Sequence, residues 1–99
     1  MNTMDNGACD AFFGQQSLER KQAVTMLLTE LDKAERKFPT WPDDLVHRAA
    51  IVAEEAGELV RASLQNQYEG DRLQELKKEA TQTGATCLRF LMKLPARGL

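Results

Sequence analysis

The segment TWPDDLVHRAAIVAEEAGELVRASLQ, residues 40–65, decides the fold that this sequence predicts. Its apolar residues recur at the three- and four-residue spacing of a helix with one apolar face. Pro42 suits a first helical turn, and Asp43 and Asp44 suit the positive end of the helix dipole. We therefore expect a helix that opens within residues 40–44 and continues to about Gln65. Its expected apolar face consists of Leu45, Ala49, Val52, Ala56, Leu59, Val60 and Ser63.

Two further helices are expected on either side of this segment. The earlier one should run from Ser17 as N-cap to Lys37 and end ahead of Pro39, because the residue before a proline is pushed out of the helical region. The later one has Asp71 as N-cap, with Gln74 three residues on in a capping-box arrangement. Its expected apolar face consists of Leu73, Leu76, Ala80, Cys87, Leu88, Leu91 and Leu94. Short connections favour antiparallel neighbours, so the sequence predicts an all-α antiparallel helical bundle.

The length of 99 residues corresponds to one domain. Residues 1–14 read as a leader in which Ala8–Phe13 could form a short helix, and residues 15–99 as a single helical domain. Three long helices with one broad apolar face each cannot complete a core as a flat trio. We therefore expect the core to be completed by oligomerisation, as a homodimer or homotetramer.

Charge and cysteine content narrow the class of protein. Thirteen basic and fifteen acidic side chains give a net charge of −2, which argues against nucleic acid as a partner. No apolar run approaches the ~20 residues of a membrane helix, so no membrane partner is expected. A disulfide between Cys9 and Cys87 is left open, but a reduced, cytoplasmic location is favoured. Cys87, on the apolar face, is expected to be buried.

The acidic residues carry the functional signal. Glu55 and Glu58 lie about 60° apart on one stripe of their helix, together with Ile51 and Ala62. Glu79 and Gln82 have the same spacing on the next helix, and both pairs border their apolar stripe in the same sense. Packed helices could therefore turn both pairs toward one cleft, with leucines filling the seam. Gathered carboxylates need a cation or protons, and hard oxygen ligands without thiolate or imidazole select Mg²⁺ or Mn²⁺.

An alternative stays open for this acidic string. Glutamate is a good helix former, and such a string is often a solvated helix face. Glu58 and Arg61 could simply form an ion pair one turn apart.

Three segments of the chain together resemble the MazG-type all-α nucleoside triphosphate pyrophosphohydrolases. They are WPDD from Trp41, EEAGELVRASL from Glu54 and KKEATQTGATCLRFL from Lys77. The likeness covers about residues 33–94. The family motif is EExxE on one helix and ExxD on the next. The resemblance implies Mg²⁺-dependent hydrolysis of nucleoside or deoxynucleoside triphosphates to the monophosphate and pyrophosphate. The residues that it implies as metal ligands are Glu55, Glu58, Glu79 and Gln82.

Gln82 departs from this motif, since an amide oxygen brings no charge and competes poorly with water for a hard cation. Glu75, one turn earlier, could partly compensate. Alternatively, the chain is a catalytically silent relative that binds a nucleotide or metal, or a helical interaction protein. If the chain is an active hydrolase, Glu54 would orient the attacking water or a ligand-bound water beside Glu55.

Five residues are candidates for contact with the substrate. Lys37, Lys78 and Arg89, and also Arg36, could meet phosphate charge, although for any one of them an ordinary surface cation is the more common case. Trp41 could stack on a nucleobase or serve as a hydrophobic staple at the helix start.

Overall fold

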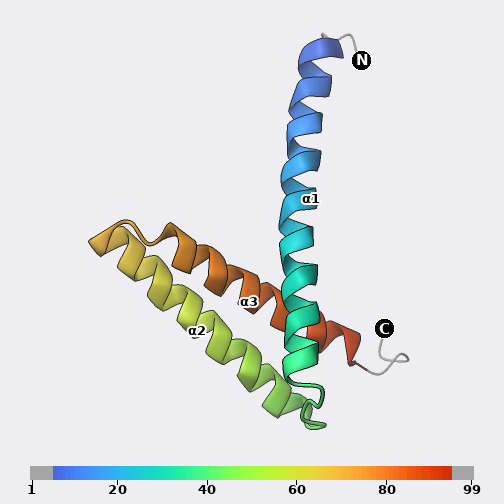
Figure 1. The fold of residues 1–99 in the computed structure, drawn as a ribbon, viewed down its shortest axis with the longest axis vertical. Helices are drawn as coiled ribbons and strands as arrows, with labels where there is room; N and C mark the ends of the chain where they lie inside the picture. The colour runs from blue at the N-terminus through green and yellow to red at the C-terminus, as the bar shows by residue number, and fades with distance from the viewer. Residues whose placement is uncertain (1–5, 95–99) are drawn as a thin grey trace.

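The computed structural model describes the backbone of residues 6–94 and the side chains of residues 14–94. This part of the chain forms three α-helices, α1 (Asn6–Lys37), α2 (Leu45–Glu69) and α3 (Leu73–Met92), and contains no strand. Helices α2 and α3 lie side by side as an antiparallel hairpin, and α1 crosses α3 near the open end of that hairpin (Figure 1). The prediction of an all-α fold is therefore confirmed.

The first helix is longer than the sequence predicts. It starts at Asn6 and runs without a break through Ser17, the expected N-cap, to Lys37. The expected short helix Ala8–Phe13 is part of it, although the side chains there lie outside the described residues. The helix ends as expected ahead of Pro39, with the Phe38 N–H donating to the Ala34 carbonyl at 2.8 Å.

The start of α2 is set by Asp44 rather than by the proline. Asp44 has an extended backbone, and its Oδ2 accepts a hydrogen bond from the His47 N–H at 2.9 Å. This is an N-cap, so the helix begins at Leu45. The expectation that Pro42 occupies the first turn is wrong, because Pro42 precedes the cap.

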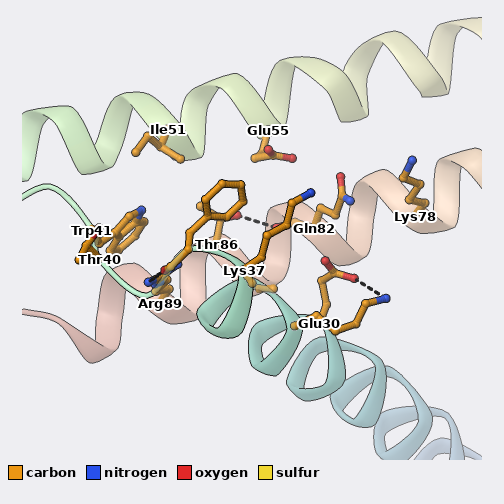
Figure 2. Close-up of a pocket in the computed structure, with 14 residues that line it drawn as sticks. Glu30, Lys37, Thr40, Trp41, Ile51, Glu55, Lys78, Gln82, Thr86 and Arg89 are labelled. Carbon is orange, nitrogen blue, oxygen red and sulfur yellow. Dashed lines mark hydrogen bonds and ion pairs between the residues drawn. The ribbon is translucent and has the colours of Figure 1, made fainter.

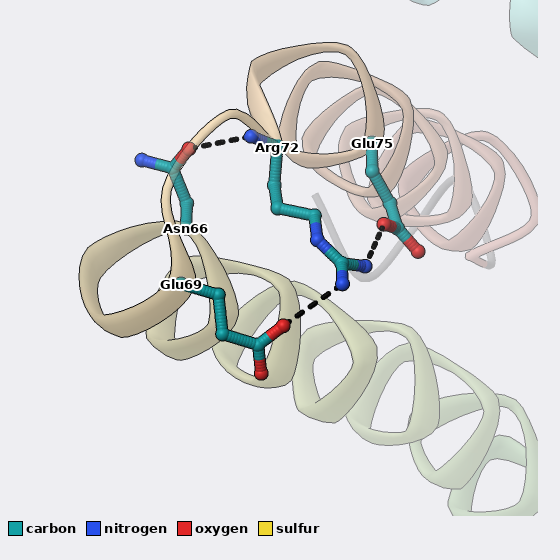
Figure 3. Close-up of polar contacts among 4 residues, drawn as sticks. All are labelled: Asn66, Glu69, Arg72 and Glu75. Atoms are coloured by element: carbon teal, nitrogen blue, oxygen red, sulfur yellow. Dashed lines mark hydrogen bonds and ion pairs between the residues drawn. The ribbon is translucent and has the colours of Figure 1, made fainter.

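The connection between α2 and α3 also differs from the prediction. Gly70 and Asp71 both have positive φ, 76° and 55°, so Asp71 cannot serve as the N-cap. Arg72 takes the cap position without a side-chain cap hydrogen bond. Its N–H donates to Asn66 Oδ1 at 3.0 Å, and its guanidinium pairs with Glu69 at 2.8 Å and Glu75 at 3.3 Å (Figure 3). The Glu75 carboxylate is thus paired with Arg72 at the turn between α2 and α3.

Few side chains of the described residues are fully buried in one chain. The buried apolar residues are Leu31, Ala62 and Ala85, and Arg89 is buried as well. The predicted apolar faces are wrong as the core of one chain, since Val60, Leu73 and Leu91 are each more than half exposed. Cys87 is exposed for the same reason, contrary to the prediction.

The molecule is extended for its length. Its radius of gyration is 17.7 Å, against about 13 Å for a compact domain of about 100 residues. Helix α1 contacts α3 but not α2 within the described residues, and its N-terminal half projects beyond the hairpin (Figure 1). Within residues 6–94, none of the helices combines the length and apolarity needed to cross a membrane.

Gly84 lies where the side chain of Leu27 on α1 packs against α3. A Cβ atom at this position would overlap the side chain of Leu27 on α1, whereas a Cβ at Gly57 on α2 would meet nothing within 4 Å. Glycine at 84 therefore allows the close approach of the two helices.

Gly84→Leu should destabilise the fold by about 1–3 kcal/mol, because the added side chain forces α1 away from α3. The matched variant Gly57→Leu replaces a helical glycine in open space and should not lower stability. Urea denaturation followed by circular dichroism measures both. Equal losses in the two variants would contradict the close approach at Gly84.

Candidate functional site

One pocket of about 740 Å³ lies where the three helices and the α1–α2 loop meet (Figure 2). Each of these elements contributes side chains to its wall. The residues that line it are Glu30, Lys33, Ala34, Lys37, Phe38, Thr40, Trp41, Ile51, Glu55, Lys78, Gln82, Ala85, Thr86 and Arg89.

Charged side chains gather at one end of this pocket, which we call the charged end (Figure 2). Helix α1 contributes Glu30, Lys33 and Lys37, with Glu30 paired to Lys33 at 3.7 Å. Glu55 faces them from α2, and α3 contributes Lys78 and Gln82. These last two residues stand one helical turn apart, which places them on the same side of α3.

The other end is lined mainly by aromatic, apolar and hydroxyl side chains, and we call it the aromatic end. It contains Thr40 and Trp41 from the loop, Ile51 from α2, and Thr86 and Arg89 from α3 (Figure 2). The Phe38 carbonyl reaches Arg89 at this end, and the Phe38 ring lies 5.4 Å from Lys37 Nζ. Planar rings and aliphatic groups present the kind of surface on which a flat, apolar ligand group packs.

Arg89 connects the loop to α3 at the aromatic end. Its side chain is 5% exposed, its Nη2 donates to the Phe38 carbonyl, and its guanidinium lies 5.1 Å from the centre of the Trp41 ring. Arg48 adds a second guanidinium at 5.8 Å from that ring and donates from Nη1 to the Lys93 carbonyl at 3.0 Å. Two cations thus hold Trp41 at the pocket wall.

The two halves of the acidic motif meet through Thr83. Its hydroxyl lies 3.0 Å from the Glu55 carbonyl on α2 and 2.8 Å from the Glu79 carbonyl on its own helix. Thr83 on α3 therefore aligns Glu55 and Glu79 along the axes of the two helices. This is the direct hydrogen-bonded link between the EExxE segment and the following acidic position.

The environment of Glu55 disfavours its charge. Partial burial raises the pKa of the Glu55 carboxyl above its ordinary value of 4.5, and the negative charges of Glu79, Glu58, Glu54 and Glu30 raise it further. A cation placed among these carboxylates would offset the repulsion between their negative charges. Helix α1 thus adds a fifth glutamate to the four of the α2 and α3 segments.

The structure brings six of the sequence-predicted site residues into this pocket. Lys37, Trp41, Glu55, Lys78, Gln82 and Arg89 all line it.

The remaining candidates lie outside the lining. Glu58 is half exposed and pairs with Arg61 at 3.8 Å, as the alternative interpretation expected. Glu54 is exposed, Glu79 is partly buried, and Arg36 pairs with Asp32 on the surface. Within residues 14–94, no three acidic, histidine or cysteine side chains stand close enough together to hold a metal ion as they are placed.

Sequence reasoning missed Glu30, which lies on the pocket wall from α1. One signal was present, because Glu30 is an acidic residue on an otherwise apolar stripe that includes Leu27, Leu31 and Ala34. A carboxylate on a packed stripe usually has a partner or a ligand.

Comparison of the chain with protein-family models, with curated proteins and with solved structures finds no match.

Glu55→Gln should stabilise the metal-free protein at neutral and alkaline pH. Because the folded chain holds the Glu55 proton more tightly than the unfolded chain, stability falls as the pH rises from about 4.5 through the raised pKa. The gain from Glu55→Gln should therefore appear above this window and vanish below it. Urea denaturation across the pH range, without divalent ions, measures it. An equal gain in Glu35→Gln, outside the pocket, would assign the effect to net charge instead.

Proposed function

We propose that the protein is a MazG-like, Mg²⁺-dependent hydrolase that converts nucleoside or deoxynucleoside triphosphates to the monophosphate and pyrophosphate. The observation that carries this proposal is the composition of one pocket. Glu55, from the EExxE segment, faces lysines from two helices at one end, and Trp41 lies at the other. A nucleotide has the same division into an anionic part and a flat aromatic part.

The charge of the pocket supports an anionic ligand. Its lining holds four cationic side chains, Lys33, Lys37, Lys78 and Arg89, and two carboxylates, Glu30 and Glu55, which leaves an excess of two positive charges. The protein as a whole has a net charge of −2. The lining itself is therefore positive and can attract phosphate groups, while the carboxylates of Glu54, Glu58 and Glu79 lie outside the lining and act on Glu55.

The residues available also suit a magnesium ion by their chemistry. Glu55, Glu58, Glu79 and Gln82 supply hard oxygen atoms, and the raised pKa of Glu55 reflects negative charge that a cation would offset. As they are placed, the three glutamates are not close enough together to hold an ion, so these four residues would hold it only with their side chains turned toward one another. Mn²⁺ could replace Mg²⁺ because both prefer oxygen ligands. Bound there, the ion would neutralise phosphate charge and make a bound water more acidic.

The other residues would position the substrate and the water. Lys37 and Lys78 bind phosphate oxygens at the charged end, while Trp41 borders the base. Arg89 holds the loop that carries Trp41, and its side chain lies next to the nucleobase. Glu54, beside Glu55 on α2, accepts a hydrogen bond from the water that attacks the phosphate chain.

A catalytically silent relative is the second candidate. The observation that favours it is Gln82, which lines the pocket where the family motif has an aspartate. Glu75, which the sequence offered as compensation, is instead 3.3 Å from Arg72. In this alternative the pocket still binds a nucleotide, but too few carboxylates remain to hold the ion for hydrolysis.

A pyrophosphate-release assay with a panel of triphosphates, with and without Mg²⁺, separates the two candidates. Release should require Mg²⁺ and fall by about 100-fold or more in Glu55→Gln and Glu79→Gln, since loss of even an outer-shell group costs 10–100-fold. Gln82→Asp should raise the rate, because it restores a charged ligand. Glu35→Gln, outside the pocket, should leave the rate unchanged. Absence of release from every nucleotide, in wild type and Gln82→Asp, would favour the silent relative.

We further propose that the active form is a homo-oligomer, at least a dimer. The apolar stripe of α2 and that of α3 stay exposed in one chain. The large hydrophobic residues of these two helices that are more than 40% exposed are Leu45, Val46, Val60, Leu64, Tyr68, Leu73, Leu91 and Met92. Exposed apolar side chains gathered on two neighbouring helices favour a protein interface. A second copy, with the same stripes, is a self-complementary partner for it.

Sedimentation at low micromolar concentration tests the oligomer. The wild-type protein should sediment with the mass of a dimer or tetramer, and Val60→Glu should shift it to a monomer, because a charge would be buried in the interface. Gln22→Glu, on exposed α1, is the matched control and should leave the mass unchanged. A wild-type protein that sediments as a stable monomer would rule out this proposal.

A further inference from the structure

We propose that a second pocket, between α1 and α3, binds the terminal phosphates of a nucleoside triphosphate, with Lys77 as the cation that contacts them. The site would thereby distinguish a triphosphate from the corresponding monophosphate. The inference rests on the proposed function, because it assigns one part of the same substrate to residues outside the first pocket.

The second pocket adjoins the charged end of the first. It has a volume of about 350 Å³, and its lining comes from α1 and α3. It shares Glu30 and Lys78 with the charged end (Figure 2). An extended ligand can therefore occupy both pockets. The residues that line the second pocket are Thr25, Met26, Thr29, Glu30, Gln74, Lys77, Lys78 and Thr81.

Polar side chains dominate this lining, although it lies between two packed helices. On α3, the lining residues from Gln74 to Thr81 recur at helical spacing and share one side of the helix. On α1, Thr25 and Thr29 stand one turn apart in the same way. Ammonium, amide and hydroxyl groups lose hydration when an apolar group covers them, and this costs free energy. The second pocket therefore suits a hydrophilic ligand.

Two lysines give the second pocket its positive charge. Lys77 and Lys78 are both exposed, and neither forms an ion pair within residues 14–94. The carboxylate among the lining residues, Glu30, lies 3.7 Å from Lys33. Each lysine carries its ammonium on a flexible four-carbon chain, so the group can turn toward an anion in the pocket.

Hydroxyl and amide groups add neutral hydrogen-bond donors. The hydroxyls of Thr25 and Thr29 can rotate to donate, and the Gln74 amide carries two N–H groups. Thr81 differs, because its hydroxyl donates to the Lys77 carbonyl at 2.7 Å. Phosphate oxygens carry negative charge and accept several hydrogen bonds, and bonds from ammonium groups to them are among the strong ones. The donors of the second pocket thus match a phosphate group.

The order of the lysines along α3 relates this pocket to the length of a phosphate chain. A phosphate chain that runs from the charged end past Lys78 reaches Lys77 in the second pocket. From Gln82 to Gln74 the two pockets follow roughly 12 Å of α3, at about 1.5 Å per residue. A monophosphate bound at the charged end stops short of Lys77. Lys77 should therefore contribute to the affinity for triphosphates alone.

Calorimetric titration with UTP, CTP, ATP and GTP and their monophosphates, without divalent ions, tests this inference. Lys77→Gln should weaken the binding of triphosphates by about 10-fold, since a hydrogen bond from a charged group contributes at least that much, and should leave monophosphates unchanged. Lys21→Gln is the matched control, because it removes the same charge from α1 outside both pockets. It should leave every affinity unchanged.

Three results would overturn the inference. They are no binding of any triphosphate, wild-type affinity for triphosphates in Lys77→Gln, and an equal loss of affinity in Lys21→Gln.

Inorganic tripolyphosphate separates a nucleotide from a free polyphosphate as the ligand. It has the same phosphate chain, so Lys77→Gln should weaken its binding as well. Wild-type protein should bind it less tightly than the best nucleoside triphosphate, because it leaves the aromatic end empty. Tripolyphosphate that binds as tightly as every nucleoside triphosphate would overturn the assignment to a nucleotide.

The outcome is separable from that of the hydrolase proposal. Mg²⁺-dependent release of pyrophosphate, with binding of triphosphates unaffected by Lys77→Gln, would leave the hydrolase standing and remove only the second phosphate pocket. Binding of triphosphates that depends on Lys77, with no turnover of any of them, would leave the second pocket standing and favour the silent relative.

Discussion

The placement of the Arg89 guanidinium is the constraint on which the rest of the site depends. It is a buried cation that joins α3 to the loop between α1 and α2 through the Phe38 carbonyl and the Trp41 ring. Without this bridge, nothing on α3 would hold Trp41 against the wall that Ile51 and Thr86 complete. Burial of an arginine costs free energy that its partners must offset, and here they include a carbonyl and an aromatic face. Arg89 near the end of α3 thus acts together with Arg48 on α2 to place the aromatic end.

The sequence predicted the number and order of the three long helices and the end of α1, because proline marks that end. Helix α2 runs four residues past its predicted end at Gln65, to Glu69 beside Gly70. It did not predict which faces would meet. An apolar stripe predicts the core of its own chain. Here, however, the buried residues of α2 and α3 include Ala62 and Ala85, and the Thr83 hydroxyl links the two helices. Sequence periodicity cannot distinguish a stripe that packs within the chain from one that is left for another copy. The same ambiguity explains why Cys87 was placed in the core.

The candidate site was predicted in part for a similar reason. Glu55 and Gln82 follow from helical spacing, since each lies at a fixed angle from its neighbours. Lys78 was expected only as one of several cations that could meet phosphate. Glu30 and the direction of Glu58 do not follow, because they depend on how α1 crosses α3 and on whether Arg61 captures the carboxylate. Spacing along one helix gives positions on that helix alone. Helix α1 packs on α3 at Leu27 and Gly84, and no pattern in the sequence predicts that contact.

The projecting part of α1 has a mechanical consequence for the pocket. About 21 residues, Asn6–Met26, precede the crossing at Leu27, and at about 1.5 Å per residue they extend roughly 30 Å. The shorter part of α1 after Leu27 carries the pocket residues Glu30, Lys33 and Lys37. An α-helix is stiff over this distance, so a force applied to the long arm would swing all three side chains together, in the opposite direction and with a reduced stroke.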